Sequence, residues 1–552
     1  MNNKKMDVQE ETVRENENRG FNMGNKISAK SKDEKLILHP SVYEGIRSLQ
    51  GAEIGVYEHE VCTNLPVRDG VILSPYYTMK INGKAIPVYA ARSANGIHSF
   101  VYVDIEGGEE GCLQLKTEIS ATENSTALRR EDAFAVVLPR SRGVIAEVRK
   151  GKATAKIDTY GSYSFAFNGN YIEPLTLIIK RFEPFSVPEG YTIKRIEPNN
   201  YVAAETNFTQ ENTVYYFEKG RYETDTIRLP ANSVFYLERG VYITVTPSPD
   251  NSVENAVFAC GDKNIRFEGR GIIDFSACCG GETFQGYTNN KSGIAFSEVM
   301  GASVRGLSII NAQSWSLCFY NCEDVYVSDV FIMGYRVFSD GVMLSDCRDG
   351  IVENCFVRTG DDAFETKSTT KSGYTNNILF RNNAAWTDKA VAYGCIYESN
   401  HDTENVRFEN NSVGFALGTW SKHLGCNVIQ MGDNPEATMH DIQFVGTEIY
   451  MSYNQAICNI YIGGSGGRGE GWGKVKNILF RDIEAENNRG LVLYIQTFEN
   501  EYSEVKSICF ENIVSNGKKF LQKSVEDKTL YDINTQVFNA ENDLHVMGEF
   551  PQ

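Results

Sequence analysis

Residues 338–368 read FSDGVMLSDCRDGIVENCFVRTGDDAFETKS, and this stretch contains two similar strand-like phrases. Asp-Gly-Val-Met-Leu begins at Asp340, and Asp-Ala-Phe-Glu-Thr begins at Asp362. The residues around them are typical of strands, and no helical periodicity connects them. The spacing predicts two equivalent segments on adjacent coils of a β-solenoid.

A second phrase recurs from about residue 200 onward: Asn or Asp, an apolar residue, a variable residue, then Phe, Val or Leu. From Val325 its apolar position recurs at Ile351, Ile378 and Val406, and each step is slightly longer than the one before it. The later steps, which end at Ile508, are longer and less regular. A drifting period without helical segments predicts an all-β, right-handed parallel β-helix over residues 186–525. We expect the longer steps to hold loops on one face, and the recurring Asn to form an internal ladder at the turns. Copies of the phrase begin at Asn264, Asp324, Asn377, Asn405, Asp441 and Asn477.

The rest of the chain divides into three parts. Residues 1–36 are polar and are expected to be a disordered extension, and residues 526–552 a C-terminal tail. Residues 37–185 alternate strand-like runs with turn signals such as Asn82-Gly83, which predicts a β-sandwich. Its role, structural support or carbohydrate binding, is left open. Two prolines in 181–190 mark a linker before the solenoid.

The bulk composition restricts the partners and the compartment. The 552 residues carry a formal net charge of −18, which argues against nucleic acid. No apolar run is long enough for a membrane helix, and no secretory signal begins the chain, so we expect a cytoplasmic protein, or a secreted one if a leader has been lost. The 13 cysteines include no CxxC pair and are expected to be buried free thiols rather than zinc ligands. No cofactor is expected, and the oligomeric state stays open.

Three aspartates carry the predicted chemistry. Asp340 and Asp362 would lie one strand spacing apart, about 4.8 Å, with Asp361 beside them. Carboxylates this close raise each other's pKa, so that one stays protonated while another is ionised, as a general acid and a general base require. Two alternatives remain: Asp-Gly and Gly-Asp-Asp are also turn residues, and clustered carboxylates also bind calcium.

Ser339-Asp340-Gly341 followed by Gly360-Asp361-Asp362 resembles the motifs of the polygalacturonases, glycoside hydrolase family 28, and of the sister dextranase and isopullulanase family, family 49. The similarity covers about residues 200–515. The resemblance implies that Asp361 is the general acid, and that Asp340 and Asp362 hold and activate the hydrolytic water.

Two departures from the polygalacturonases bear on the substrate. Their Gly-His-Gly motif is replaced by Ala392-Tyr393-Gly394, and the Arg-Ile-Lys motif that grips a uronate corresponds to Asn459-Ile460-Tyr461. Without a cationic clamp, a uronate carboxylate would be poorly matched, although Arg468 offers one charge. The dextranase family is the closer match, because it also places a β-sandwich before the solenoid and a tryptophan-containing stretch after the aspartates, similar to residues 386–394.

Further substrate-binding candidates surround the aspartates. The repeat step from Ile351 to Ile378, applied to Asp362, leads to Lys389, which places Asp388, Lys389 and Tyr393 in the same cleft. Trp315 and Trp386 are candidate sugar platforms, with ordinary packing as the alternative. Alternation puts Glu365 and Lys367 on one side of their strand, as an ion pair or as substrate contacts. Tyr461 and Arg468 complete the predicted set.

We therefore expect an inverting glycoside hydrolase acting on a neutral poly- or oligosaccharide such as an α-glucan. The alternatives are a polygalacturonase-like pectin hydrolase, a calcium-dependent polysaccharide lyase, and a non-catalytic sugar-binding solenoid.

Overall fold

The computed structural model describes most of the chain between residues 70 and 520. Within that range the undescribed residues are 108–112, 126, 199–207, 248–253, 279–290, 371–372, 397, 419–423, 454–455, 464–470 and 498–501. Outside it, only the backbone of four short strands is described. The predicted extension over residues 1–36 lies outside the described residues. Residues 37–552 form one compact unit.

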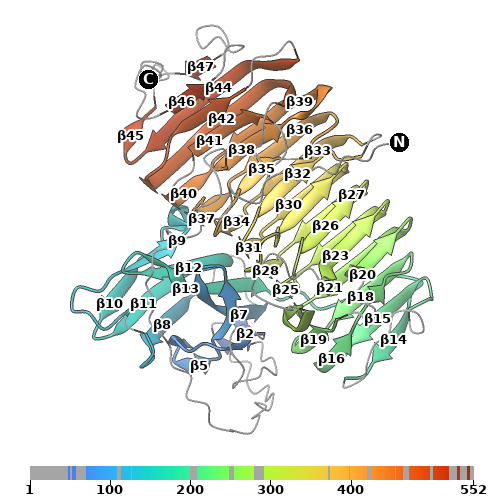
Figure 1. The fold of residues 1–552 in the computed structure, drawn as a ribbon. Coiled ribbons are helices and arrows are strands. Elements are labelled where there is room, and N and C mark those ends of the chain that lie inside the picture. The colour runs from blue at the N-terminus through green and yellow to red at the C-terminus, as the bar shows by residue number, and fades with distance from the viewer. Residues whose placement is uncertain are drawn as a thin grey trace, which may run out of the picture. The chain divides into compact units, whose positions relative to one another are not determined.

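Two sheets make up the N-terminal part, as predicted (Figure 1). The eight-stranded sheet contains β1 (Ser48–Leu49), β2 (Ala52–Val56), β3 (Ile72–Leu73), β6 (Tyr89–Ser93), β7 (Gly96–Gly107), β9 (Ala135–Leu138), β12 (Gly161–Phe167) and β13 (Asn170–Arg181). The five-stranded sheet contains β4 (Tyr77–Ile81), β5 (Lys84–Ile86), β8 (Leu115–Ala121), β10 (Ala146–Arg149) and β11 (Lys152–Ile157). All pairs are antiparallel except β7 with β13, which are parallel.

Alternation along the strands builds the core of this sandwich. The burial of β4 alternates strictly, so Tyr77, Met79 and Ile81 face inward against residues of β7 and β12 such as Val103 and Phe165. The predicted hairpin at Asn82-Gly83 is confirmed: both residues have positive φ, 50° and 81°, as a tight two-residue hairpin turn requires.

From β14 onward the chain winds as a parallel β-helix with three walls. Strands of the 23-stranded sheet fall into two series that pair coil by coil, and the 11-stranded sheet forms the third wall. The first wall consists of β14 (Thr192–Ile196), β15 (Thr213–Phe217), β18 (Ser233–Leu237), β21 (Lys263–Gly269), β24 (Met300–Arg305), β27 (Glu323–Ser328), β30 (Arg348–Glu353), β33 (Thr375–Arg381), β36 (Thr403–Glu409), β39 (Asp433–Val445), β42 (Trp472–Asn488), β44 (Ser503–Ser515) and β47 (Leu544–Met547), with β45 (Lys518–Lys519) folded back on β44. The second wall consists of β16 (Gly220–Thr224), β19 (Val241–Val245), β22 (Ile272–Asp274), β25 (Ser308–Ile310), β28 (Phe331–Met333), β31 (Phe356–Thr359), β34 (Ala384–Thr387), β37 (Ser412–Ala416) and β40 (Glu448–Ser452).

The third wall consists of β17 (Ile227–Arg228), β20 (Glu254–Cys260), β23 (Lys291–Ser297), β26 (Leu317–Tyr320), β29 (Val342–Ser345), β32 (Phe364–Lys367), β35 (Tyr393–Cys395), β38 (Gly425–Met431), β41 (Ala456–Ile462), β43 (Leu493–Gln496) and β46 (Tyr531–Asn534). Strands β46 and β47 pair in parallel with β43 and β44, so the coils continue into the stretch interpreted as a tail. Two 3₁₀ turns complete the elements, η3 (Arg140–Arg142) and η4 (Ser276–Cys278).

The recurring phrase explains why the coils stack. Its Phe residues form a ladder inside the solenoid, with ring centroids 4.6–5.2 Å apart and nearly parallel planes, through Phe380, Phe408, Phe444, Phe480 and Phe510. The phrase Asn residues have φ between 53° and 57°, the left-handed conformation that Asn tolerates, and their side chains form a ladder at the exposed turn rather than inside. The internal asparagine ladder is formed by Asn383 and Asn411, each of which accepts from a backbone N–H on the preceding coil.

One predicted step of the repeat is wrong. Val325 pairs with Gly350, not with its neighbour Ile351, and Gly350 pairs with Ile378. A Cβ at Gly350 would lie 2.7 Å from Leu344 and 2.9 Å from Ile378, so the glycine occupies the phrase's apolar position while its neighbours fill the space. The coil before Gly350 is therefore shorter than predicted, and the coil after it is longer by the same amount.

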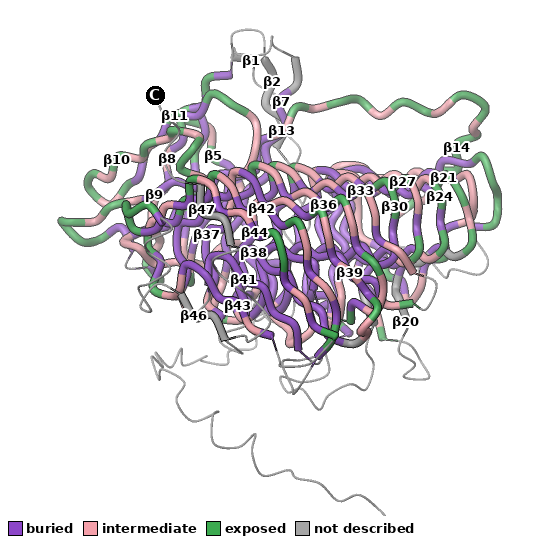
Figure 2. The backbone as a smooth tube through the Cα atoms, turned by 90° about the horizontal axis from the view of Figure 1, so that it is seen from above, coloured by how far each residue is buried: buried purple, intermediate pink, exposed green. Residues whose placement is uncertain are grey.

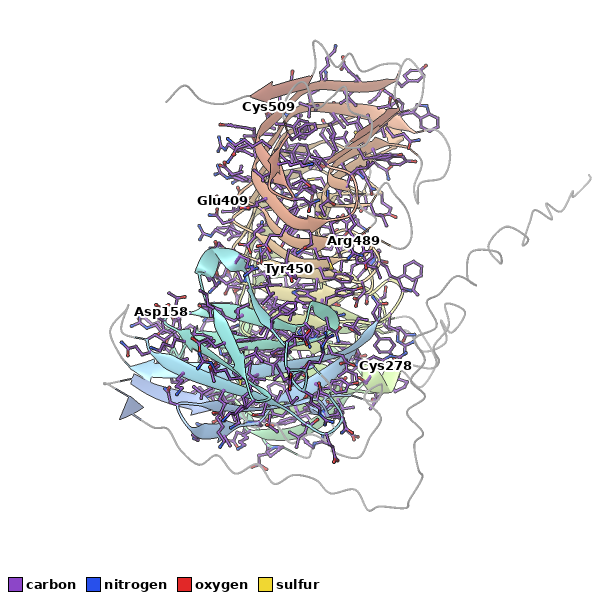
Figure 3. All side chains as sticks on the ribbon, turned by 90° about the vertical axis from the view of Figure 1, so that its left-hand side faces the viewer. Asp158, Cys278, Glu409, Tyr450, Arg489 and Cys509 are labelled. Atoms are coloured by element: carbon purple, nitrogen blue, oxygen red, sulfur yellow. The ribbon has the colours of Figure 1, made fainter. Side chains whose placement is uncertain are left out.

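The sandwich packs against the second wall (Figure 1). Phe100 and Tyr102 of β7 contact Phe331 of β28, and Tyr171 stacks on Phe415 of β37 at 3.8 Å. Tyr450 of β40, labelled in Figure 3, belongs to the same apolar cluster. After β13, an exposed linker leads back to β14 at the first described coil (Figure 2). The second wall meets the first wall along one edge and the third wall along the other.

Candidate active site

Asp340 and Asp362 precede strands β29 and β32, at the edge between the second and third walls. Val342 pairs with Phe364, and the Gly341 N–H donates to the Asp362 carbonyl at 2.8 Å. The predicted equivalence of the two aspartates is therefore confirmed. A Cβ at Gly341 would lie 2.2 Å from the Ala363 carbonyl oxygen on the following coil, and one at Gly360 would lie 2.2 Å from the Arg336 carbonyl oxygen on the preceding coil, so only glycine allows this close approach.

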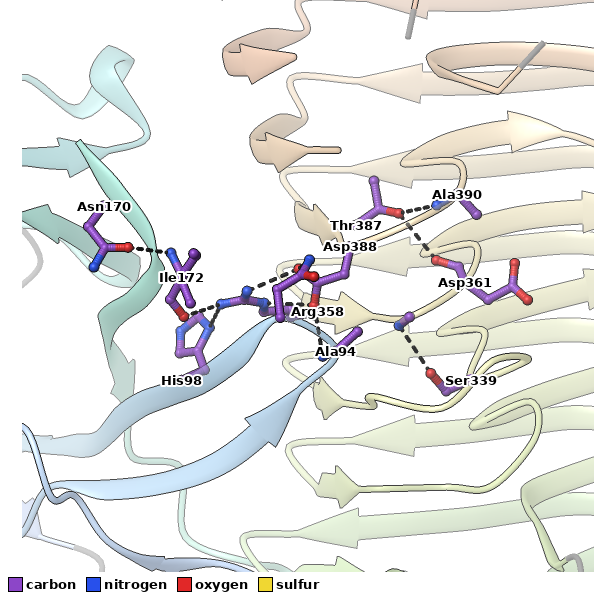
Figure 4. Close-up of polar contacts among 12 residues, drawn as sticks. Ala94, His98, Asn170, Ile172, Ser339, Arg358, Asp361, Thr387, Asp388 and Ala390 are labelled. Atoms are coloured by element: carbon purple, nitrogen blue, oxygen red, sulfur yellow. Dashed lines mark hydrogen bonds and ion pairs between the residues drawn. The ribbon is translucent and has the colours of Figure 1, made fainter. Parts of the chain in front are cut away.

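The Gly360-Asp361-Asp362 turn is fixed from both neighbouring coils. On one side the Gly360 N–H donates to Ser339 Oγ at 3.1 Å. On the other, the Val391 N–H donates to Asp362 Oδ1 at 2.8 Å, and Thr387 Oγ1 donates to the Asp361 carbonyl at 3.4 Å. Figure 4 shows the Asp361 carboxyl pointing away from the sandwich. The turn thus presents the Asp361 side chain while the backbone is held.

Five acidic side chains and one lysine meet at this edge, Asp361 and Glu398 among them. Carboxylate oxygens of Asp340, Asp362 and Glu365, all buried, lie within 4.8 Å of one another. Lys367 Nζ lies 3.0 Å from Glu398, 3.5 Å from Glu365 and 3.9 Å from Asp340. Glu365 and Lys367 lie on the same side of β32, as predicted, and Lys367 is an ion-pair partner rather than a free cation.

Burial dominates the electrostatics of this carboxyl cluster, which we define as Asp340, Asp361, Asp362 and Glu365. Burial raises the pKa of Asp361 to about 7, and Lys367 acts against it. Burial and the Asp361 carboxyl raise the pKa of Asp340 and of Asp362 well above the ordinary value. Burial would lower the pKa of Lys367, but the surrounding carboxylates outweigh it and raise that pKa, so the lysine stays charged. The predicted crowding of like charges is confirmed, and not all of these carboxyls ionise together.

A second buried ion pair lies directly behind the same turn. Arg358, fully buried, donates to both carboxylate oxygens of Asp388 at 3.0 and 3.2 Å, and to the Ile172 carbonyl. Asp388 also accepts from the Ala94 N–H at 3.2 Å and from Asn95 Nδ2 at 3.0 Å, both at the tip of the β6–β7 hairpin (Figure 4). Burial and the Arg358 cation lower the pKa of the adjacent His98 well below its ordinary value, so this imidazole is neutral.

Three predicted substrate contacts are wrong. Trp386 is buried against His98 and under Arg358, at the contact with the sandwich. Asp388 is fully buried in the ion pair with Arg358. Tyr393 points into the solenoid core, where it stacks on Phe364 and its hydroxyl donates to the Asn383 and Ser412 carbonyls. The sandwich packs on the second wall and covers the first two, while strand alternation turns Tyr393 inward.

The predicted step from Asp362 to Lys389 is too short. Phe364 pairs with Tyr393, so the coil after Asp362 is longer than predicted. Val391 is therefore the equivalent of Asp362, and the half-buried Lys389 lies before that position.

The remaining predicted contacts lie at different distances from the cluster. Trp315 is half-buried and lies at the cluster, with Lys367 Nζ 5.1 Å above its ring. Tyr461 is in register with Lys367 but three coils further on, and buried. Arg468 lies outside the described residues.

Two residues of the site carried no recognisable signal in the sequence. Glu398 pairs with Lys367 but lies in a loop of irregular spacing. Arg358 stands shortly before Asp361, and only the folded sandwich shows its role in holding the turn. A hard cation would find three carboxylates at Asp340, Asp362 and Glu365, but the Lys367 ammonium occupies the space beside two of them.

The fold and this site define a right-handed parallel β-helix with buried paired carboxyls at one edge. Residues 247–418 match the glycosyl hydrolases family 28, so the predicted resemblance to the clan of families 28 and 49 is confirmed. The structure resembles that of Dex49A from Penicillium minioluteum with a TM-score of 0.66 and 12% identity, covering 91% of this chain and all of that one. This likeness includes the sandwich as well as the solenoid.

Two curated proteins match over part of the chain. An alpha-L-rhamnosidase, rgxB, of Aspergillus niger is 20% identical over 291 residues, 47% of this chain and 64% of that protein. A probable exopolygalacturonase B of Aspergillus flavus is 25% identical over 243 residues, 39% of this chain and 44% of that protein. The chain thus spans less than two thirds of each. No helix among the described residues is long and apolar enough to cross a membrane.

Proposed function

We propose that this protein is an inverting glycoside hydrolase whose substrate is a neutral poly- or oligosaccharide. The observation that carries the proposal is the arrangement of Asp340, Asp361 and Asp362 on adjacent coils, buried, beside one lysine. The family match over the same coils supports a hydrolase acting on glycosidic bonds.

Asp361 is the proposed general acid. With a pKa raised to about 7 by burial, its carboxyl holds a proton near neutral pH and can deliver it to the glycosidic oxygen as the bond breaks. Asp340 and Asp362, whose oxygens lie together, hold the attacking water and accept its proton. Burial raises the pKa of both carboxyls, and the Lys367 charge near Asp340 and the Val391 N–H on Asp362 act against it, in favour of the ionised form that a base needs. A water between acid and base leads to inversion.

The charges around Lys367 support a neutral substrate. The outward positions of the third wall in register with Lys367 are Ser297, Tyr320, Ser345, Ile396, Gln430, Tyr461 and Gln496, and those in register with Glu365 include Cys318, Met343, Asn459 and Tyr494. Among these described positions Lys367 is the one cation, and acidic side chains already surround it. A uronate carboxylate would therefore meet net negative charge, whereas sugar hydroxyls would meet hydrogen-bonding groups and the Trp315 ring.

The test is hydrolysis of a panel containing dextran, pullulan, polygalacturonate and rhamnogalacturonan by the intact protein, by Asp361→Asn and by Asp158→Asn. Asp158 is exposed on the sandwich (Figure 3) and is the matched control. We expect reducing ends from a neutral glycan, insensitive to EDTA, with activity lowered about 10²- to 10⁴-fold in Asp361→Asn and unchanged in Asp158→Asn. NMR of the first product should show the inverted anomer.

Other outcomes are equally informative. Cleavage of the uronates alone would contradict the neutral substrate. Loss of activity with EDTA, together with an unsaturated product absorbing in the ultraviolet, would replace the hydrolase by a calcium-dependent lyase that uses the three-carboxylate group as its metal site.

A further inference from the structure

A large groove lies at the opposite edge of the second wall from the carboxyl cluster. Its volume is about 920 Å³, and its lining comes from β13 and the linker after it, from η3, and from the turns between the first and second walls. Ala384, which begins β34, lines it, whereas the Asp388 ion pair follows the other end of that short strand. The groove and the cluster are therefore separate sites on one wall.

Three asparagines form a regular row along this groove. Asn354, Asn382 and Asn410 occupy the same turn on successive coils, each with φ between 53° and 57°, and all three are exposed. Pairing of the flanking strands sets their backbones about 4.8 Å apart. Asp329, paired with Lys180, ends the row on one side, and Gly446 ends it on the other. None of the three amides hydrogen-bonds to another described side chain, so each presents a free donor and a free acceptor.

Most charges lining the groove are already paired within the protein. Its acidic residues all have partners: Asp329 pairs with Lys180, Glu268 with Arg266, and Glu183 with Arg305, while Glu448 accepts from the Arg140 and Ser141 N–H groups. Arg270 pairs with Asp104, and Arg142 donates to the Tyr160 carbonyl. Four of the six cations that line the groove are therefore in ion pairs, and only Arg142 and Arg181 lack a carboxylate partner among the described residues, so the groove carries a small positive excess rather than a strong field for an ionic ligand.

Aromatic rings provide the apolar surface of the same groove. Phe185 of the linker stacks on Tyr236 with centroids 4.1 Å apart, and Tyr326 lies under Arg305. Rings beside a regular row of amides suit sugars, whose ring faces are apolar and whose hydroxyls both donate and accept. A repeating ligand also matches a repeating row of amides.

We infer that this groove is an accessory binding site for a neutral polysaccharide chain, separate from the site of hydrolysis. The choice of a neutral glycan rests on the proposed function, but the binding itself does not require that the protein cleave the chain. The groove would hold a polymer on the enzyme while another part of it, or a neighbouring chain, reaches the carboxyl cluster.

The test compares Asn354→Gly/Asn382→Gly/Asn410→Gly with Asn321→Gly, each in the full chain with Asp361→Asn. Glycine accepts the left-handed φ of these turns, so the amides are removed without backbone strain. Asn321 is an exposed, left-handed asparagine on a turn outside the groove. Calorimetry with soluble dextran and pullulan should show affinity lowered at least tenfold in the triple variant and unchanged in Asn321→Gly. With Asp361 intact, the triple variant should raise KM for the polymer and leave turnover of short oligosaccharides unchanged.

Equal affinity of the two variants would overturn the site, as would binding of an unfolded polypeptide in preference to the glycan. Loss of polymer binding in the triple variant of a protein that hydrolyses no glycan would support the groove and refute the hydrolase. Hydrolysis without any polymer binding outside the cluster would support the hydrolase and refute the groove.

Discussion

Two buried groups of charged side chains lie on either side of the Gly360-Asp361-Asp362 turn, and they differ in how completely they are satisfied. Arg358 and Asp388 balance each other's charge, and Asp388 accepts further hydrogen bonds from the β6–β7 hairpin. The carboxyl cluster instead has four acids for one lysine. Asp340 Oδ1 and Glu365 Oε1 lack a hydrogen-bond partner within the described structure, and Glu365 Oε2 has only the Lys367 ammonium at 3.5 Å.

This difference separates a structural group from a functional one. Burying an unpaired polar atom costs free energy that a fold seldom retains without a reason. The balanced pair joins the sandwich to the solenoid and holds the backbone of the turn. The unbalanced cluster leaves carboxyl oxygens available to bind a water and a sugar. Removing one charge of the Arg358–Asp388 pair should therefore lower the free energy of unfolding, whereas removing a carboxyl of the cluster should raise it.

The largest expected effect on stability is at the balanced pair. Arg358→Met leaves Asp388 buried and uncompensated, and should lower the free energy of unfolding by about 3–5 kcal/mol. Arg358→Met/Asp388→Leu removes both charges and should recover much of that loss. Urea unfolding of both variants gives the comparison. A single variant as stable as the double would mean that Asp388 finds another counter-charge.

The solenoid and its aspartates were predictable because their signals are local and repeat. The step from Asp340 to Asp362 contains no insertion, so the spacing in the sequence converts directly into adjacent coils. The next step failed for two reasons that each contribute one residue. A glycine in an apolar position hides the phase of the repeat at Gly350, so the predicted step was one residue too short, and the turn after Thr387 adds one residue more. Together they move the equivalent of Asp362 from Lys389 to Val391.

The coil repeat in the sequence does not indicate the roles of Trp386 and Asp388. Both contact residues of the β6–β7 hairpin, which lies far away in the sequence. A tryptophan and an aspartate after a catalytic-type motif resemble substrate contacts as long as the sandwich's position is unknown. The sandwich was predicted as a fold, but sequence alone gave no indication of the wall on which it packs.

An intermediate effect of opposite sign is expected in the carboxyl cluster. Burial and the Asp361 carboxyl raise the folded-state pKa of Asp362, so its contribution to stability is present at acid pH and is lost as pH rises above the unfolded value. Asp362→Asn removes that penalty and should raise the free energy of unfolding at pH 8 by about 0.5–2 kcal/mol while abolishing activity. At pH 3 the gain should vanish. Thermal unfolding at both pH values checks this, and a gain that persists at pH 3 would point to packing instead.

The smallest expected effect concerns the one cation of the cluster, and it tests whether the carboxyls titrate as a group. Lys367 lowers the pKa of Asp361, Asp340 and Asp362. In Lys367→Met both limbs of the pH profile of kcat/KM should therefore move to higher pH, because the acid keeps its proton longer and the base loses its proton later. Lys476→Met, which removes a surface ion pair with Glu504, is the control and should leave the profile unchanged. Movement of only the alkaline limb would assign the lysine to Asp361 alone, and movement of either limb to lower pH would show that Lys367 does not govern the charges of this cluster.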